Sequence, residues 1–246
     1  MITELKLKLK YKSEERLSYQ ITSVMHGILM GHIDREYGNE MHQNGLKPFT
    51  QTICDIKEDT FTWKICTLTE EAKIQIIDKL IMVDEFYMKH RDLKLKVLER
   101  NYKELSYDTL LENYYFQAQN RNITIRFYSP TSFKSQGNYV FMPSVRLIFQ
   151  SLIQKYDEFS CSTKVGSEET LEQIEKYVSI ICYNLKSTKF SLEGIRVPAF
   201  IGMITFRVKG PQQLANLIKM LLIFGQYSSV GIKTALGMGQ IKVEGE

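Results

Sequence analysis

The order in which strand-like and helix-like segments follow one another constrains the fold of this chain more than any single motif. Residues 2–11 alternate apolar and charged side chains with a period of two, which predicts a strand. Apolar residues at helical spacing then predict a helix over residues 13–34 with Ser13 as its cap, followed by a turn or irregular piece rich in Gly and Asn. The next segments predict a hairpin, a second helix and a further strand, in that order: residues 49–69, 70–83 and 93–102.

The same order recurs in the second half of the chain, after a polar and helical connector over residues 106–120. It consists of a strand, a helix that starts at Ser144, a strand pair, a helix with Pro211 in its first turn, and a last strand. An additional helix over residues 167–178 is an insertion. Because β-α-β-β-α-β is the ferredoxin-like order, the sequence predicts an α+β fold. We expect two tandem ferredoxin-like (RRM-like) domains, residues 1–119 and 120–246, with a glycine-rich loop before the last strand.

The composition indicates a globular protein without a membrane partner. Apolar residues make up 43% of the chain and charged residues 24%, and no apolar run approaches the roughly 18 residues that span a membrane. The N-terminal residues alternate like a strand rather than a signal peptide, so we expect a cytoplasmic protein. The four cysteines never form a CxxC pair, and therefore no metal site is expected.

The stretch SSVGIKTALGMGQIKV, residues 228–243, holds Gly231, Gly237 and Gly239 within nine positions. Glycines gather where the chain turns sharply or where another group approaches the backbone closely. The stretch lies between a helix and a strand, so it lacks the strand-before-helix context of a Walker loop or a dinucleotide fingerprint. Two interpretations stay open: a tight helix–strand connection, or a loop that contacts an extended phosphate chain such as RNA, with Lys233 inside it.

The charge of the chain is uneven. From Lys176 to the end there are nine Lys or Arg residues but only three acids, Glu193, Glu244 and Glu246. Such a distribution attracts a polyanionic partner, although a merely solvated basic surface is the plain alternative.

Two histidines are candidates for acid–base chemistry. His42 lies in the polar segment before the hairpin, and Lys47 follows five residues later. An imidazole and an ammonium group in one loop can act as an acid–base site, or both can be solvated loop residues. His26 follows an apolar run on the first predicted helix, where a partly buried and satisfied histidine is the alternative to a functional one.

The stretch SVGIKTALGMGQIKVEG resembles the C-terminal signature of the CRISPR-associated repeat-processing endoribonucleases, the Cas-six family. That signature is Gly-hydrophobic-Gly, five residues, then Gly-hydrophobic-Gly. The chain departs from it only at the first glycine, where Ser229 stands. MHGILMGHI and EMHQNGLKPFT also look like the family's first helix and catalytic histidine segment. HGILM, PTSFKSQGNYVFMPSVRLIFQSL and GIKTALGMG together resemble the branch that serves type III (Csm-type) systems.

The resemblance implies metal-independent cleavage of CRISPR precursor RNA within each repeat, by attack of a 2′-hydroxyl on the adjacent phosphate. The products are a 2′,3′-cyclic phosphate and a 5′-hydroxyl, and no cofactor is required. By position, His42 matches the family's general acid–base histidine and Lys47 its charge-stabilising lysine. Some members place a tyrosine on the first helix where this chain has Met30, and His26, one helical turn earlier, could take its place.

The resemblance also implies an RNA-binding surface and partners. The expected partners are the CRISPR precursor repeat, a type III effector complex in transient association, and a second copy of the chain in a homodimer. The residues expected to contact RNA are Lys134, Gly231, Lys233, Gly237 and Gly239.

Two other functions fit parts of this pattern. A non-catalytic RNA-binding subunit of a CRISPR effector complex shares the fold and often the loop, but it lacks a catalytic histidine. A ferredoxin-like protein that binds a small molecule is disfavoured by the basic C-terminal half. His42 is therefore the residue that separates the enzyme from the binding subunit.

Overall fold

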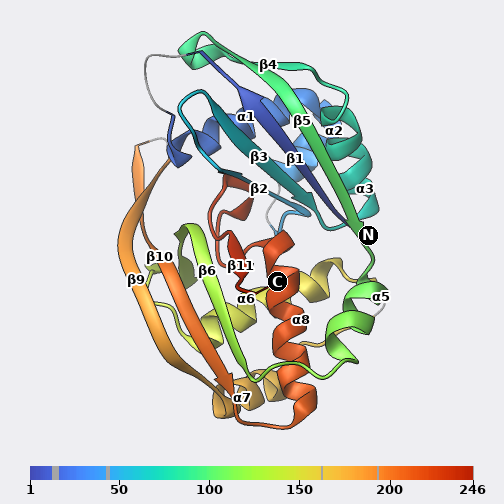
Figure 1. The fold of residues 1–246 in the computed structure, drawn as a ribbon, viewed down its shortest axis with the longest axis vertical. Coiled ribbons are helices and arrows are strands. Elements are labelled where there is room, and N and C mark those ends of the chain that lie inside the picture. The colour runs from blue at the N-terminus through green and yellow to red at the C-terminus, as the bar shows by residue number, and fades with distance from the viewer. Residues whose placement is uncertain (13–16, 43–44, 162, 193, 246) are drawn as a thin grey trace. The chain divides into compact units, whose positions relative to one another are not determined.

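The computed structural model describes residues 1–12, 17–42, 45–161, 163–192 and 194–245. The chain divides into two compact units, which Figure 1 shows as ribbons. The first unit comprises Met1–Glu104 with Ala235–Gly237, and the second comprises Leu105–Thr234 with Met238–Glu246. None of the helices within the described ranges combines the length and apolar character needed to cross a lipid bilayer.

The first unit contains a five-stranded sheet with helices on its apolar face. The strands follow the order β2-β3-β1-β5-β4, and the first four of these have the strand order of a ferredoxin-like unit. The short strand β4 extends the sheet beyond β5, an addition that the sequence did not predict. The strands are β1 (Ile2–Lys10), β2 (Phe49–Cys54), β3 (Thr60–Thr67), β4 (Glu85–Met88) and β5 (Leu93–Leu105). The helices are α1 (Thr22–His32), α2 (Arg35–His42), α3 (Glu70–Ala72) and α4 (Asp78–Leu80), with a π-helical turn at Lys73–Ile77 between the last two.

A polar link within the apolar core joins this sheet to the start of α1. Gln51 on β2 is buried, and its amide oxygen accepts a hydrogen bond of 2.8 Å from the indole N–H of Trp63 on β3. The Gln51 side-chain nitrogen donates another of 2.8 Å to the carbonyl of Thr22. Because buried polar groups must be paired, these two bonds fix where α1 begins relative to the sheet.

Two predictions for the first unit were wrong in detail. The first helix begins at Thr22, after a 3-10 turn at Tyr19–Ile21, and the proposed cap Ser13 lies outside the described residues. The segment expected to be irregular contains α2. Its Tyr37 is buried in the core and its Met41 packs against the same core, so tertiary packing outweighs the weak helix propensity of Gly and Asn.

The second unit repeats the arrangement. Its strands follow the order β11-β6-β10-β9, again the ferredoxin-like order, and a separate hairpin is formed by β7 and β8. The strands are β6 (Asn122–Thr131), β7 (Phe133–Ser135), β8 (Asn138–Val140), β9 (Val178–Leu192), β10 (Ile195–Val208) and β11 (Ile241–Val243). The helices are α5 (Tyr107–Leu110), α6 (Val145–Phe159), α7 (Glu168–Tyr177) and α8 (Gln212–Ser228), with a π-helical turn at Leu111–Tyr115 after α5.

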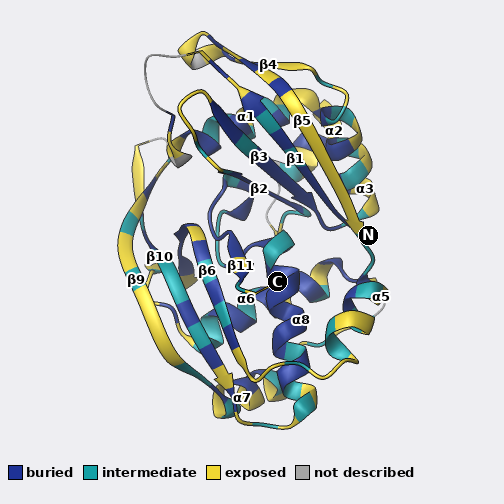
Figure 2. Cartoon of the chain, viewed as in Figure 1, coloured by how far each residue is buried: buried dark blue, intermediate teal, exposed yellow. Residues whose placement is uncertain are grey.

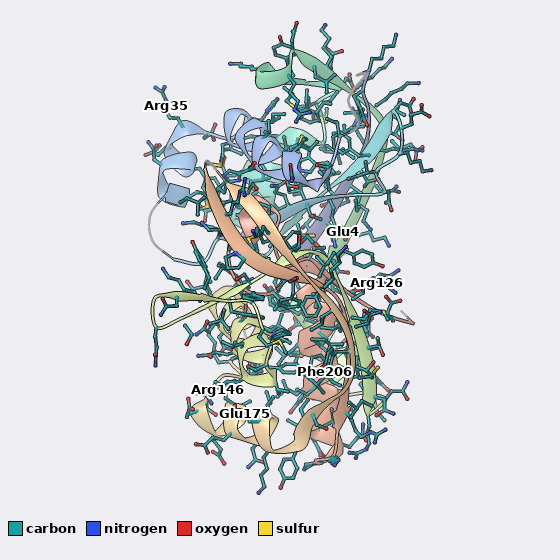
Figure 3. All side chains as sticks on the ribbon, turned by 90° about the vertical axis from the view of Figure 1, so that its left-hand side faces the viewer. Glu4, Arg35, Arg126, Arg146, Glu175 and Phe206 are labelled. Carbon is teal, nitrogen blue, oxygen red and sulfur yellow. The ribbon has the colours of Figure 1, made fainter. Side chains whose placement is uncertain are left out.

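The helices of this unit begin where their sequence signals indicate. The Ser144 side chain accepts a hydrogen bond from the N–H of Leu147 and caps α6, as predicted. The inserted helix α7 is held to α6 by Arg146, whose guanidinium lies 2.7 Å from Glu175 and 2.6 Å from Glu168. Figure 3 labels Arg146 and Glu175, which face each other across the two helices. The additional helix is therefore packed onto the unit rather than extending from it.

Burial differs sharply between the elements of the second unit. Figure 2 shows α8 as largely buried, whereas the edge strand β9 is largely exposed. Asn216 on α8 binds the connector that precedes β6: it accepts from the N–H of Gln119 at 3.1 Å and donates to the carbonyl of Tyr115 at 2.8 Å. The connector, predicted as a helical link, thus packs on α8.

Candidate functional site

The glycine-rich loop between α8 and β11 has a backbone in which positive φ angles recur. Such angles occur at Ser229 (54°), Gly231 (79°), Lys233 (53°), Gly237 (103°) and Gly239 (77°). Residues with a Cβ rarely adopt this left-handed region, so three of the five positions are glycine for a local reason.

Two of the glycines are needed because the protein's own backbone lies against them. A Cβ on Gly231 would stand 2.2 Å from the carbonyl oxygen of Ser132. A Cβ on Gly239, which is buried, would stand 1.9 Å from the carbonyl oxygen of Val230. No contact with RNA is required to explain either glycine, and their expected role in binding RNA stays a prediction.

The third glycine belongs to the part of the loop that packs with the first unit. Residues 235–237 belong to the first unit, and the Ala235 side chain is part of its hydrophobic core. Gly237 is buried, and a Cβ there would stand 2.1 Å from the methyl carbon of Thr22 at the start of α1. Its RNA contact is likewise a prediction that the packing does not need.

Hydrogen bonds hold the two ends of the glycine loop together, and we call this closed part, residues 229–232 and 238–239, the neck. The N–H of Val230 donates to the carbonyl of Gly239 at 2.8 Å, and both Val230 and Met238 are fully buried. The two glycine–hydrophobic arms of the sequence pattern therefore meet, with their apolar side chains anchored inside. The neck is also bonded to the end of β6, because the N–H of Gly239 donates to the carbonyl of Pro130 at 3.0 Å and that of Ile232 donates to Ser132 at 3.0 Å.

Helix α6 holds the other side of the neck through two residues one turn apart. The Ser151 hydroxyl accepts a hydrogen bond of 2.8 Å from the N–H of Gly231. The buried ammonium group of Lys155 donates to the carbonyls of Ser228 at 3.1 Å and Ser229 at 2.9 Å. These carbonyls end α8, where helical carbonyls lack partners of their own and favour a cation. Burial lowers the pKa of Lys155 to about 7, because desolvation disfavours the charged form.

The candidate catalytic residues lie in the first unit. His26 is half-buried on α1, and its ring stacks on Phe49 with centroids 5.9 Å apart and planes 5° apart. Met30, four residues later on the same helix face, packs partly buried against the core. The position expected for a tyrosine is therefore occupied by an apolar side chain.

His42 and Lys47 flank a short gap in the described chain. His42 is the last residue of α2, and its side chain lies outside the described residues. Lys47 is half-buried two residues before β2, and burial lowers the pKa of its ammonium group below the ordinary value. The structure thus places His26, His42 and Lys47 in one unit, whereas Lys134, Gly231, Lys233 and Gly239 belong to the other.

The basic residues of the C-terminal part are mostly available to a ligand. Among the nine counted from Lys176, Lys219 is buried and Lys233 is half-buried. The other seven are exposed: Lys176, Lys186, Lys189, Arg196, Arg207, Lys209 and Lys242. Most of the basic residues that make up the imbalance in the sequence therefore lie on the surface.

The sequence matches known proteins over nearly its whole length. A family model described as CRISPR-associated endoribonuclease Cas6 matches residues 125–241. A CRISPR-associated endoribonuclease Cas6 of Streptococcus thermophilus is 37% identical over 240 residues, which are 97% of this chain and 98% of that protein. The chain belongs to the Cas6 family. A Cas6 endoribonuclease of Mycobacterium tuberculosis is 32% identical over 226 residues, 89% of this chain and 70% of that protein.

Solved Cas6 structures share the fold. A Cas6 product complex superposes with a TM-score of 0.82 at 21% identity, covering 99% of this chain and 100% of that one. Thermus thermophilus Cas6 gives a TM-score of 0.77 at 21% identity, covering 99% and 98%. The tandem ferredoxin-like architecture and the Cas6 resemblance predicted from the sequence are thus confirmed, and the chain is an endoribonuclease of CRISPR RNA processing.

Steric exclusion at the neck makes a first prediction. We expect Gly239→Ala to lower the free energy of unfolding by at least about 2 kcal/mol, because a Cβ meets a backbone carbonyl at a positive φ. Gly137→Ala, at φ 83° with open space around it, should cost less because only the backbone conformation is strained. Urea unfolding of both variants checks this. Equal midpoints for Gly239→Ala and the natural chain would rule out the steric account.

The buried Lys155 predicts a dependence of stability on pH. Its pKa is lower in the folded than in the unfolded chain, so the unfolded chain binds more protons above pH 7 and stability rises with pH. Lys155→Met lacks this titration, so the free energy of unfolding of the natural chain should rise relative to that of the variant between pH 7 and 8.5. One proton accounts for up to about 1.4 kcal/mol per pH unit.

The control for Lys155 is the same pair of proteins between pH 5 and 6. Both states then hold the proton, and the difference in free energy of unfolding should stay constant. A difference that is equally flat from pH 7 to 8.5 would show that the ammonium group carries no burial cost.

Proposed function

We propose that this Cas6 protein cleaves CRISPR precursor RNA within its repeats without a metal ion, by attack of the ribose 2′-hydroxyl on the adjacent phosphate. The observation that carries the proposal is the match to Cas6 endoribonucleases over 97% of the chain, which is not confined to the glycine loop. The basic surface of the C-terminal part supports an RNA substrate, because exposed Lys and Arg attract phosphates.

In the proposed reaction, a base removes the proton of the 2′-hydroxyl and the oxygen attacks phosphorus. The bond from phosphorus to the 5′-oxygen breaks, and an acid returns a proton to that oxygen. One product ends in a 2′,3′-cyclic phosphate and the other begins with a 5′-hydroxyl. His42 is the general acid–base group, since an imidazole can give and take protons near neutral pH.

Lys47 stabilises the negative charge that develops on the phosphate oxygens. A half-buried ammonium group is suited to this, because a charge interaction is stronger where water is partly excluded. His26 is the candidate for a third contact on α1, where the Phe49 ring supports its imidazole from one side. The non-catalytic alternative is less well supported, because the matching relatives named above are endoribonucleases.

The finer assignment follows from the same resemblance. We infer that the protein serves a type III (Csm-type) system, associates transiently with its effector complex, and forms a homodimer. Size-exclusion chromatography with light scattering, with and without the effector complex, measures both associations.

We expect cleavage of a repeat-containing precursor RNA to continue at an unchanged rate in excess EDTA and to leave a cyclic phosphate end. Replacing the nucleotide 5′ of the cut by its 2′-deoxy form should abolish cleavage but leave binding intact, because only the nucleophile is lost. End-group analysis and a binding titration provide the readouts. Strict dependence on added Mg²⁺ would contradict the mechanism.

We expect His42→Ala to lower the single-turnover cleavage rate by roughly 10²- to 10⁴-fold, the usual effect of removing a general acid–base group. RNA affinity should change little. His32→Ala is the matched control, because His32 is an exposed histidine on α1. If His26→Ala were more damaging than His42→Ala, the roles assigned to the two histidines would be reversed.

A further inference from the structure

The β7–β8 hairpin of the second unit is a short, well-defined projection that the sequence did not predict. Lys134 stands opposite Tyr139 in its register, and Ser135 stands opposite Asn138. The turn consists of Gln136 and Gly137, with φ angles of 47° and 83°, and two positive values are typical of a type I′ hairpin turn. The hairpin, yellow-green in Figure 3, projects from the rest of the unit.

The two faces of the hairpin differ in character. Phe133 is buried and its ring lies over Phe200 with centroids 6.3 Å apart, so one face packs on the unit. Because side chains alternate along a strand, Lys134 and Tyr139 share the opposite face, where directly opposed Cβ atoms lie about 5 Å apart. Tyr139 is 40% exposed, and Phe141, just after the hairpin, is 44% exposed.

The base of the hairpin is bonded to the glycine loop. The Ser132 carbonyl, directly before β7, accepts the N–H of Ile232 at 3.0 Å, and the missing Cβ of Gly231 leaves room for it. Each of the two bonded residues has a lysine close by in the sequence: Lys134 lies two residues after Ser132, and Lys233 directly follows Ile232. Two lysines from distant parts of the sequence thus lie next to the same hydrogen bond between the glycine loop and the base of the hairpin.

The charge and the ring together indicate the partner. Residues 131–142 contain no acidic side chain, so no carboxylate of the hairpin itself opposes the charge of Lys134 beside the exposed tyrosine. A tyrosine ring stacks on nucleic-acid bases of any sequence, while ammonium groups contact phosphates. Stacking needs a base whose face is exposed, which excludes the interior of a duplex.

We propose that the β7–β8 hairpin binds an unpaired segment of the repeat RNA, with one base stacked on Tyr139 and the adjoining phosphates held by Lys134 and Lys233. The proposal rests on the proposed function, since it concerns the RNA substrate of the same protein. It assigns to Tyr139 a role in recognising unpaired nucleotides, separate from the chemical step.

The test uses Tyr139→Ala and Tyr139→Phe, each in the His42→Ala background so that the RNA stays uncut. The probes are a precursor repeat RNA, a 12-nucleotide oligoadenylate and a blunt 12-base-pair RNA duplex. We expect Tyr139→Ala to weaken binding of the first two by roughly 5- to 100-fold and binding of the duplex by less than 2-fold. Tyr139→Phe should bind like the natural residue, because it keeps the ring.

Two controls complete the design. Tyr102→Ala removes another tyrosine with 40% exposure, from β5 of the first unit, and should leave all three affinities unchanged. Lys134→Ala and Lys233→Ala should each reduce the salt dependence of oligoadenylate binding by roughly one phosphate contact. Circular dichroism shows that each variant is folded.

Several outcomes would overturn the proposal. These are natural affinity in folded Tyr139→Ala, equal losses in Tyr139→Phe and Tyr139→Ala, and an equal loss of duplex binding. The proposed catalytic function fails on a different observation, undiminished cleavage by His42→Ala, so the two failures are distinguishable.

Discussion

The close approach of three backbone segments at the neck of the glycine loop is the constraint on which the second unit depends. The carbonyls of Ser132 and Val230 occupy the space that side chains would need at Gly231 and Gly239. With that space free, the end of α8, the end of β6 and the start of β11 can all lie within hydrogen-bond distance. Val230 and Met238 then fill the core beneath. A side chain at either glycine would separate the segments and leave their backbone groups unpaired.

The same neck explains the placement of two polar residues in a largely apolar helix. Ser151 and Lys155 lie one turn apart on α6, so they reach the loop from the same helix face. A buried ammonium group is costly unless its hydrogen bonds are satisfied. Here two carbonyls at the end of α8 accept them, and those carbonyls would otherwise lack helical partners. The ammonium group of Lys155 and the carbonyls at the end of α8 therefore provide each other's hydrogen-bond partners.

Periodicity predicted the long elements of this fold and failed where local signals are short or misleading. The element order that predicts both sheets rests on strands whose alternation extends over many residues, such as β1 and β6. Strands β4, β7 and β8 span three or four residues, too few for a period of two to be distinguished from chance. Helix α2 was missed because Gly and Asn indicate a turn, whereas the burial of Tyr37 that stabilises it is a tertiary effect.

For the candidate site, the glycine pattern in the sequence located the loop. It could not show that the approaching group is protein, because that requires the position of Ser132, about 100 residues earlier. Lys155 gave no signal, because a lysine in an amphipathic helix is usually solvated.

The proposed function assigns a different physical task to each of the two units. Attraction between exposed lysines and phosphates acts over roughly 10 Å, is weakened by salt and tolerates imprecise geometry. Proton transfer needs groups within hydrogen-bond reach and is governed by their pKa values. The C-terminal part with the excess of basic residues belongs to the second unit, while His26, His42 and Lys47 lie in the first.

The glycine loop is the segment where the chain leaves the second unit for residues 235–237 and returns at Met238. The neck of the loop has no room for a Cβ at Gly231 or Gly239. The packing and hydrogen bonds of the loop come from the protein itself and need no RNA. An RNA contact by this loop, as proposed, would therefore use a backbone that is already ordered, whereas a flexible glycine loop would have to meet its ordering cost from the affinity for RNA.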